Sequence, residues 1–257
     1  MVAVTRAGAV GVLELNRPGK FNALRRTDFA EMAAGLDEFE RPGSGVRAVL
    51  LCASGDHFCT GGDLAEAKTM LGDSPALERF LRLAHATLAR LADSPLPVVA
   101  ACQGLVLAGG LELILCCDVV FAADNARFGD QHVQYGLVPA WGATQRLPRV
   151  VGPNRALDLM YSGRRIDART AAQWGLASYA VPAAELAAAA RGYCETLATR
   201  SRPALTAMKS LCRTALDEPL GSGLRLEREA VVRATAGPDP AEGIAAFEAR
   251  RAPRFAD

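Results

Sequence analysis

One acidic residue of this 257-residue chain stands inside a strongly apolar run. Glu112 follows two glycines and precedes a stretch of aliphatic side chains, and Glu112 and Asp118 are the only acids between positions 105 and 123. An ionised carboxylate taken out of water without partners is very costly. The sequence therefore predicts that Glu112 is either paired structurally or used chemically, and this segment alone leaves both interpretations open.

The two glycines, Gly109 and Gly110, favour chemical use of this acid. Glycine lets a backbone approach a bound molecule closely. If a helix begins here, its first N–H groups are unpaired and can bind an anion. An anion site beside a half-buried acid is what a reaction through a thioester enolate requires. A membrane-spanning helix is not expected, because two acids and two glycines interrupt the run.

A second glycine pair lies in the segment 58–64, which reads FCTGGDL and follows a predicted strand and a short loop. Neither pair matches a nucleotide-binding P-loop or the dinucleotide fingerprint GxGxxG. A third segment, 136–147, reads GLVPAWGATQRL. Each of these segments alone would indicate only a turn, so it is their combination that is informative.

The composition limits the classes of partner and cofactor. Half of the residues are hydrophobic, which is enough for one large domain or a core domain with a smaller appendage. The net charge of +1 gives no reason to expect nucleic acid or a membrane surface as a partner. Three histidines without the usual ligand spacings make a zinc site improbable, and no metal is expected.

The cysteines and the start of the chain indicate the compartment. There are seven cysteines, an odd number, and no C-x-x-C pair, while Cys102, Cys116 and Cys117 sit in apolar runs. They are typical of small core residues in a reducing compartment rather than of a disulfide framework. The first residues lack the continuous apolar region of a signal peptide. We therefore expect a cytoplasmic protein.

The elements that must position these segments are strands separated by helices. Continuous apolar runs predict strands, and helical spacing of apolar residues predicts a helix that begins at a Thr27 cap. Such runs, separated by helices, argue for sheets covered by helices on a face. The predicted strands are 10–15, 46–52, 97–102, 118–122 and a short one at 127–128, and the clearest helices are 27–39 and 77–91.

After about residue 153 the pattern becomes entirely helical. Pro203, Pro219 and Pro238 mark helix boundaries, since proline is tolerated near a helix start. For most of these residues we expect packing and subunit assembly rather than chemistry. The predicted helices are 154–161, 168–174, 183–200, 203–217 and 223–235.

The three glycine-containing segments, in this order, resemble the crotonase family, also called the enoyl-CoA hydratase/isomerase superfamily. The resemblance covers nearly the whole chain. It implies an α/β fold, a spiral of β-β-α repeats with a C-terminal helical trimerisation region. We expect a catalytic core at 1–195 and an oligomerisation region at 196–257. Further matching motifs lie at 15–18, 22–24, 128–129, 242–247 and 250–251.

The resemblance implies an acyl-CoA thioester substrate, with coenzyme A as part of that substrate and no separate cofactor. Two backbone N–H groups, which fall on Thr60 and Gly109, would form the oxyanion hole. The adenosine diphosphate part would lie near 22–25 and 62–64, although Arg25 fits a solvated surface arginine equally well. The expected substrate-binding residues are Ala23, Arg25, Gly62, Asp63, Leu64, Gly110, Gln131, Pro139 and Trp141.

Two positions depart from the hydratase pattern. Hydratases of the family hold the added water with two glutamates; the first falls on Glu112, but the second falls on His132. Imidazole can exchange a proton near neutral pH or orient a water, and the alternative is a histidine of the site wall. His57 and His85 are expected on the surface or a helix face. Trp141 either narrows the acyl pocket, or stacks on the acyl group, or packs in the core.

The function that this resemblance favours is hydration of an α,β-unsaturated enoyl-CoA, with Glu112 as base on water. His132 would then orient the water or supply the α-proton. An isomerase that moves a double bond, decarboxylation and C–C cleavage remain alternatives, because the enolate site is shared. A non-catalytic acyl-CoA-binding protein would not need Glu112. The expected assembly is a homotrimer or homohexamer.

Overall fold

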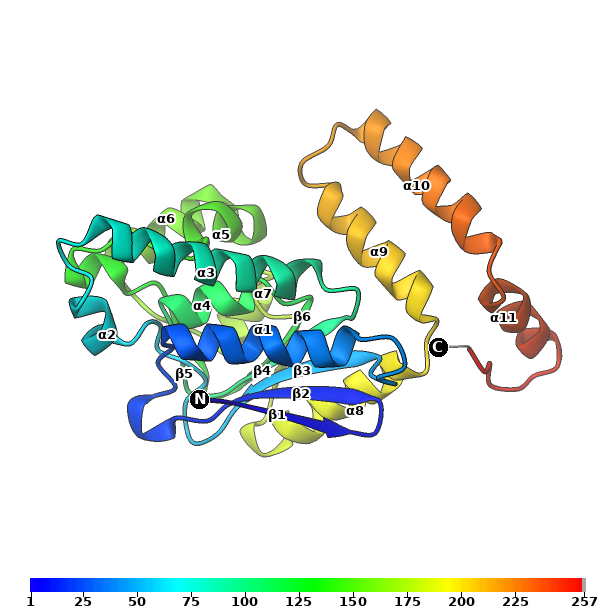
Figure 1. The fold of residues 1–257 in the computed structure, drawn as a ribbon, viewed down its shortest axis with the longest axis horizontal. Helices are drawn as coiled ribbons and strands as arrows, with labels where there is room; N and C mark the ends of the chain where they lie inside the picture. Colours follow the sequence, from blue (N-terminus) through cyan, green and yellow to red (C-terminus); the bar gives the residue numbers. More distant parts are fainter. Residues whose placement is uncertain (256–257) are drawn as a thin grey trace.

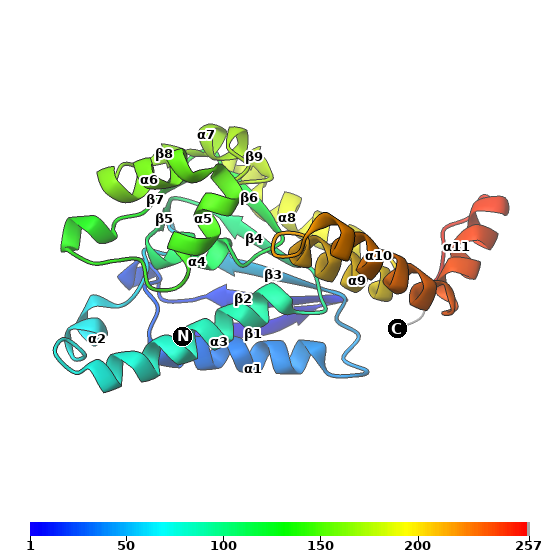
Figure 2. The ribbon, with the colours of Figure 1, turned by 90° about the horizontal axis from the view of Figure 1, so that it is seen from above.

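The computed structural model describes residues 1–255, and their centre is a six-stranded sheet with the order β1-β2-β3-β4-β6-β9 (Figures 1 and 2). β1 and β2 pair antiparallel, and every other neighbouring pair is parallel. The strands are β1 (Val2–Ala7), β2 (Val10–Leu15), β3 (Ala48–Ala53), β4 (Val98–Cys102), β6 (Val119–Ala123) and β9 (Tyr179–Val181). The strands predicted within 10–122 are confirmed to within two residues, whereas β1 and β9 were not predicted.

A second, three-stranded sheet has the order β5-β7-β8 and lies beside the first. Its strands are β5 (Leu105–Leu107), β7 (Arg127–Gly129) and β8 (Ile166–Asp167). β5 follows β4 after only two residues and leads directly into helix α4 (Gly109–Ile114). The short strand predicted at 127–128 is confirmed as β7. Glu112 and His132, the predicted catalytic pair, both lie just beyond strands of this small sheet.

Helices cover both faces of the larger sheet, whereas the sequence predicted helices on a face. On one face, α1 (Arg26–Glu40), α3 (Ser74–Asp93) and α4 pack against alternate residues of the strands. On the other face, α8 (Leu186–Ala198) packs against the intervening residues, as Figures 1 and 2 show. Each central strand is therefore buried on both sides, which explains why its sequence is continuously apolar.

The start of α1 differs from the prediction. Thr27 does not cap the helix, because α1 begins at Arg26 and its N-cap is Arg25. The carboxylate of Asp28, the third residue of the helix, accepts a hydrogen bond from the Arg25 backbone N–H at 2.7 Å, as the acid of a capping box does. The apolar positions predicted for the core face are buried, among them Phe29 and Leu36.

The remaining helices lie in two groups. Those around the small sheet are α2 (Leu64–Lys68), α5 (Ala143–Val151), α6 (Pro153–Ser162) and α7 (Ala168–Gln173), with the 3-10 turns η1 (Pro18–Lys20), η2 (His132–Tyr135) and η3 (Ala183–Glu185). The C-terminal group is α9 (Arg202–Thr214), α10 (Leu220–Thr235) and α11 (Asp239–Glu248). The region after residue 153 is thus mainly helical, but the short strands β8 and β9 interrupt it, and α5 and α11 were not assigned from the sequence.

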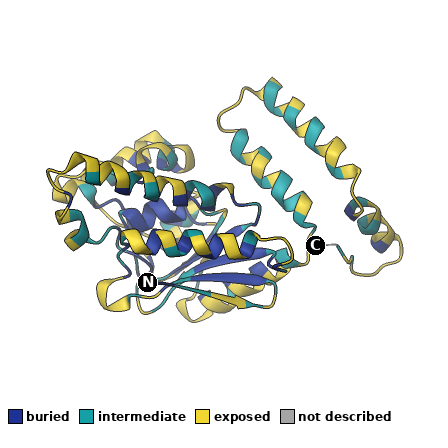
Figure 3. Ribbon diagram, viewed as in Figure 1, coloured by how far each residue is buried: buried dark blue, intermediate teal, exposed yellow. Residues whose placement is uncertain are grey.

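The C-terminal group extends away from the sheets (Figures 1 and 2). Lys209 ties α9 to the core through Asp118 at 2.7 Å and the Leu96 carbonyl at 3.0 Å. Neither α9 nor α10 contains a buried residue, and Figure 3 shows them as exposed or half-buried along their length. Large apolar side chains such as Phe247, which is 84% exposed, remain uncovered.

The cysteines behave as the sequence predicted. All seven are free, and Cys59, Cys102, Cys116 and Cys194 are buried. Burial raises the pKa of the Cys116 thiol to about 11, so it stays protonated and behaves as a small apolar core residue. Within residues 1–255, no helix combines the length and hydropathy that a bilayer span needs.

Candidate active site

The chain turns sharply at Ala108 to start helix α4. Ala108 adopts a left-handed φ of 49°, and its N–H donates to the Gly129 carbonyl at 3.0 Å, which ties the turn to β7. Gly109 is the first residue of the helix, as the glycine pair predicted. A Cβ on Gly109 would lie 2.1 Å from the Trp141 ring, so only glycine fits there. The first amides of α4 therefore point out of the helix beside Trp141.

Glu112 lies one turn into α4 and is fully buried. Its Oε1 accepts hydrogen bonds from the backbone N–H groups of Trp141 at 2.7 Å and Ala143 at 3.0 Å. Its Oε2 is buried without a hydrogen-bond partner among the described residues. Burial raises the pKa of the Glu112 carboxyl, and the two N–H donors and His132 partly oppose that rise. One oxygen is thus held structurally, and the other is free for chemistry.

His132 is the group that faces this free oxygen. Its Nε2 lies 3.8 Å from Glu112 Oε2, and its side chain is 14% exposed. Burial lowers the pKa of His132, but the hydrogen bond and charge of Asp130 together with the charge of Glu112 outweigh it, so the pKa is raised overall. The structure therefore brings together Glu112 and His132, as the sequence predicted.

Asp130 completes this group and was not predicted. It is fully buried, and its Oδ1 lies 2.9 Å from His132 Nδ1 and accepts from the His132 backbone N–H at 3.1 Å. The spacing Asp-x-His was visible in the sequence. An acid directly after a short strand is also typical of a solvated turn, so this spacing alone does not indicate a buried partner of the imidazole.

The predicted oxyanion donor Thr60 does not fit its role. Its N–H already donates to the Phe21 carbonyl at 3.2 Å, because Phe21 turns through a left-handed φ of 51° and presents that carbonyl to the loop. The Gly62 N–H has no acceptor within the part of the chain described here. Gly62 forms a β-bridge with Leu24, but the two hydrogen bonds of that bridge join Leu24 to the Gly61 carbonyl and to the Asp63 N–H. Gly62 therefore replaces Thr60 as the available donor in this loop.

The Trp141 ring lies against both glycines that carry free amides. A Cβ on Gly62 would meet the same ring at 3.4 Å. The ring is 6% exposed and packs edge-on against Phe29, with centroids 4.9 Å apart, and Phe80, with centroids 6.1 Å apart. Trp141 is thus a core residue, and it also forms the apolar wall beside Gly62 and Gly109.

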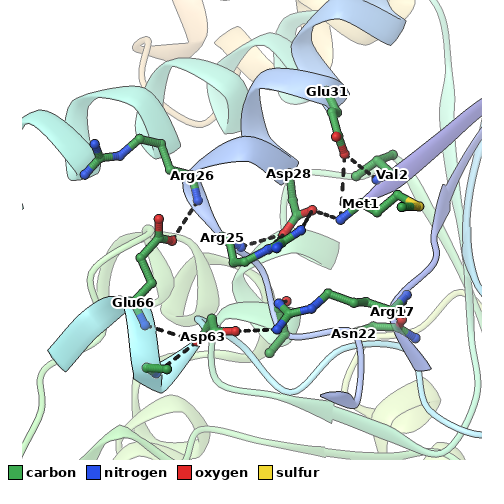
Figure 4. Close-up of polar contacts among 12 residues, drawn as sticks. Met1, Val2, Arg17, Asn22, Arg25, Arg26, Asp28, Glu31, Asp63 and Glu66 are labelled. Atoms are coloured by element: carbon green, nitrogen blue, oxygen red, sulfur yellow. Dashed lines mark hydrogen bonds and ion pairs between the residues drawn. The ribbon is translucent and has the colours of Figure 1, made fainter. Parts of the chain in front are cut away.

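The residues predicted near the adenosine diphosphate part gather around Arg17 (Figure 4). The Arg17 guanidinium pairs with Asp63 at 2.6 Å and donates to the Ala23 carbonyl at 3.0 Å. That hydrogen bond is the main reason why the pKa of Asp63 is lowered. Asp63 also caps α2, where Leu64 is exposed. Ala23, Asp63 and Leu64 therefore lie together, whereas Arg17 was not singled out from its Leu-Asn-Arg-Pro motif.

The other predicted substrate-binding residues have mainly local partners. Arg25 pairs with the buried Asp28 at 3.3 Å, as Figure 4 shows, so its guanidinium has a local partner. Gln131 donates to the Gly163 carbonyl at 2.5 Å and so ties its loop to that residue. A Cβ on Gly110 would lie 2.3 Å from the Cys59 carbonyl oxygen, which explains that glycine by packing. Pro139 is half-buried in the loop that precedes Trp141.

The two other histidines lie outside the group around Glu112. His85, on α3, donates from Nε2 to the Ala140 carbonyl at 2.6 Å and so holds the Trp141 loop. The ring of His57 stacks on Phe21, with centroids 5.3 Å apart. Across residues 1–255, no set of three His, Cys, Asp or Glu side chains is arranged to hold a metal ion.

Comparison with known proteins gives one consistent result. The family model described as enoyl-CoA hydratase/isomerase matches residues 5–257. A probable enoyl-CoA hydratase of Mycobacterium tuberculosis is 35% identical over 99% of this chain and 97% of its own length. The mitochondrial enoyl-CoA hydratase of Pongo abelii is 32% identical over 96% of this chain and 84% of its own length.

Solved structures agree with these sequence relatives. The enoyl-CoA hydratase from Bacillus anthracis has a TM-score of 0.94 and 32% identity, with 99% of this chain and 98% of that chain covered. The enoyl-CoA hydratase from Polaromonas sp. JS666 has a TM-score of 0.95 and 29% identity, with 99% of each chain covered.

Proposed function

The chain belongs to the enoyl-CoA hydratase/isomerase family, as the sequence resemblance predicted, and from that premise we propose that it adds water to an α,β-unsaturated acyl-CoA thioester. The crotonase fold is likewise confirmed. One observation carries the proposal. The unpartnered Oε2 of buried Glu112 faces His132 Nε2 at 3.8 Å, and the loop residue Trp141, which holds the other oxygen of Glu112, packs its ring against Gly62 and Gly109.

The two amides supply the electrostatic part of the reaction. The thioester carbonyl oxygen would accept hydrogen bonds from Gly62 and Gly109, and the negative charge that develops on this oxygen would lie at the N-terminus of α4. Loss of one such donor typically costs about 3–4 kcal/mol of transition-state stabilisation. Because both donors are backbone groups, neither position needs a side chain. Both can be glycine, which leaves room for the Trp141 ring to pack against them.

The two side chains move the protons. Glu112 Oε2 takes a proton from the attacking water, whose oxygen forms a bond to the β-carbon while the C=C electron pair moves into the enolate. The enolate then collapses and takes a proton at the α-carbon from His132 Nε2. The proton held by Glu112 returns to His132 across the 3.8 Å gap, which restores both groups. The raised pKa of His132 supports the proton-donating role.

Isomerisation is the second candidate, and one observation favours it. Glu112 is the carboxylate whose unpartnered oxygen, Oε2, faces His132, and one base suffices to move a proton along an acyl chain. Incubation with crotonyl-CoA separates the candidates, because hydration removes the conjugated thioester absorbance and adds the mass of one water. Isomerisation leaves the mass unchanged, and a non-catalytic binding protein changes neither quantity.

The proposed reaction needs the CoA thioester as its handle and no metal or redox cofactor. Arg17, Ala23 and Asp63 form the region proposed to receive the adenosine diphosphate part. Binding energy from this distant end of the substrate can be used to position the acyl end. The seven unpaired cysteines agree with the proposed cytoplasmic location.

The C-terminal residues 196–257 are proposed to form the oligomerisation region, with 1–195 as the catalytic core. α9 to α11 leave apolar side chains uncovered, among them Leu220, Leu224 and Phe247. Uncovered apolar surface of this kind marks an interface, and closed symmetric oligomers are its usual outcome. A homotrimer or homohexamer is therefore the proposed assembly.

A further inference from the structure

Asp130 contacts His132 twice through a single oxygen. Its Oδ1 accepts from the His132 backbone N–H at 3.1 Å and lies 2.9 Å from the ring atom Nδ1. Asp130 is fully buried, and its second oxygen, Oδ2, has no hydrogen-bond partner among the described residues. A buried carboxylate with one unused oxygen is costly to keep for structural reasons alone.

These two contacts fix the state of the imidazole ring. An ionised carboxylate only accepts hydrogen bonds, so Nδ1 must carry the proton in the bond to Asp130. Nε2 is then the ring atom left to face Glu112 Oε2, 3.8 Å away. Without Asp130 the ring could turn over and exchange its two nitrogens, and either nitrogen could carry the proton.

We propose that Asp130 is a positioning residue, which acts through His132 and holds its ring so that Nε2 faces Glu112 and exchanges the proton with substrate. This inference rests on the proposed function and adds a third residue to it. Asp130 touches neither the free amides nor Glu112 through a hydrogen bond, so its effect on the reaction must pass through the imidazole.

The charges around the ring agree with this role. Among the residues described, the charged groups that act on His132 are Asp130, which follows β7, and Glu112, on α4. The hydrogen bond and charge of Asp130 are the larger of the two influences that raise the pKa of His132, and burial opposes them. Replacing Asp130 by a neutral residue must therefore move the titration of His132 to lower pH.

The first test is Asp130→Asn, with Asp158→Asn as the matched control. Asp158 lies on α6 at the surface, where it pairs with Arg164. We expect Asp130→Asn to lower kcat for crotonyl-CoA hydration by roughly 10- to 10⁴-fold, the range seen when a carboxylate that orients a histidine is removed. KM should stay within a few-fold, and Asp158→Asn should retain full activity. An unchanged kcat in Asp130→Asn would overturn the proposal.

A double-mutant cycle separates positioning from a general structural role. If Asp130 acts through the ring, adding Asp130→Asn to His132→Gln should cause no further loss of kcat, because the ring is already gone. A second loss as large as the first would show that Asp130 acts independently of His132, and would overturn the proposal.

Nitrogen NMR of labelled histidine tests the same point without turnover. The chain has three histidines, so the His132 signals can be assigned by their disappearance in His132→Gln. In the wild type, Nδ1 should remain protonated when the ring becomes neutral; in Asp130→Asn, both tautomers and a lower titration midpoint are expected. Identical tautomer and midpoint in the two proteins would contradict the inference. If the wild type fails to hydrate crotonyl-CoA, the proposed function fails while this measurement still decides the role of Asp130.

Discussion

Glu112 Oε1 accepts a hydrogen bond from the backbone N–H of Trp141 at 2.7 Å, so the loop that carries the aromatic wall also holds the reacting carboxylate. Ala143 N–H binds the same oxygen at 3.0 Å. Because both donors bind Oε1, Oε2 is the oxygen of this carboxylate that keeps no hydrogen bond among the described residues, and it faces His132. The shape of the proposed acyl pocket and the orientation of the proposed base are therefore coupled through one loop.

The first prediction concerns Glu112→Gln. The amide oxygen of glutamine can accept the same two backbone bonds, so the fold should be kept, while the basic oxygen is replaced by an NH₂ group. Loss of a general base should lower kcat by about 10²–10⁴-fold or more. Steady-state hydration of crotonyl-CoA measures this, and calorimetry should show that binding of the CoA ester persists. Glu78→Gln, a surface change on α3 that touches only the ion pair with Arg82, is the matched control. Near wild-type turnover in Glu112→Gln would remove Glu112 from the mechanism.

Substitution by alanine should affect stability and activity differently at Gly62 and at Gly109, the two glycines that carry free amides. In Gly109→Ala the added methyl would lie 2.1 Å from the Trp141 ring, and such overpacking costs about 1–3 kcal/mol or more. In Gly62→Ala the nearest contact is 3.4 Å, an ordinary distance, so stability should change little. We expect a clear loss of thermal stability and activity only in Gly109→Ala. Equal effects of the two substitutions would contradict the placement of the ring.

The sequence predicted the parts of this molecule that depend on local patterns. The apolar runs gave the central strands, and the glycine pair located the start of α4 and the burial of Glu112. The assignment of the second oxyanion donor failed for a non-local reason. Whether Thr60 or Gly62 keeps a free amide depends on the left-handed turn at Phe21, about 40 residues earlier, whose carbonyl takes the Thr60 N–H.

Asp130 and the N-terminal strand β1 likewise could not be predicted from local sequence patterns. The Asp-x-His spacing is local, but the burial of Asp130 results from packing that the spacing does not encode. β1 begins at residue 2 and alternates exposed and buried positions only weakly, because it is an edge strand paired on one side with β2. Its sequence therefore lacks the continuous apolar run that marks β3 and β4.

Trp141→Ala should change the preference for acyl chain length. Removal of the ring from its contacts with Phe29 and Phe80 leaves a cavity beside Gly62 and Gly109, and such a truncation costs about 3–5 kcal/mol of stability. The same space should admit a longer acyl group. We expect the ratio of kcat/KM for a longer-chain enoyl-CoA to that for crotonyl-CoA to rise relative to the wild type. A ratio that stays constant would show that the ring does not border the acyl site.

The assembly prediction is tested by light scattering. The exposed apolar residues of α9 to α11 should be covered by other copies of the chain, so the measured mass at micromolar concentration should be three or six times 27.1 kDa. Phe247→Glu places a charge on the most exposed of these side chains and should weaken the assembly. A monomeric wild type would contradict the role proposed for residues 196–257.

The last prediction is a pH dependence that originates at His132. Its pKa in the folded protein is raised above the ordinary value of 6.5, because Asp130 and Glu112 favour the charged ring more strongly than burial disfavours it. As a proton donor, His132 must be charged, so kcat should fall as pH rises through that raised pKa. The stability contribution of the ring has the same sign: it is fully present below 6.5, the unfolded value, and is lost as pH rises through the folded pKa.

His132→Gln supplies the reference for both measurements. Its residual activity should lack the alkaline decline, and the difference in unfolding free energy between wild type and His132→Gln should shrink above pH 6.5. His132→Glu restores a two-carboxylate arrangement and should keep or raise hydration of short enoyl-CoA esters if the backbone places residue 132 correctly. If His132 were only part of the site wall, His132→Ala would stay active with an unchanged pH profile. That result would leave Glu112 as the single base and would favour isomerisation over hydration as the function.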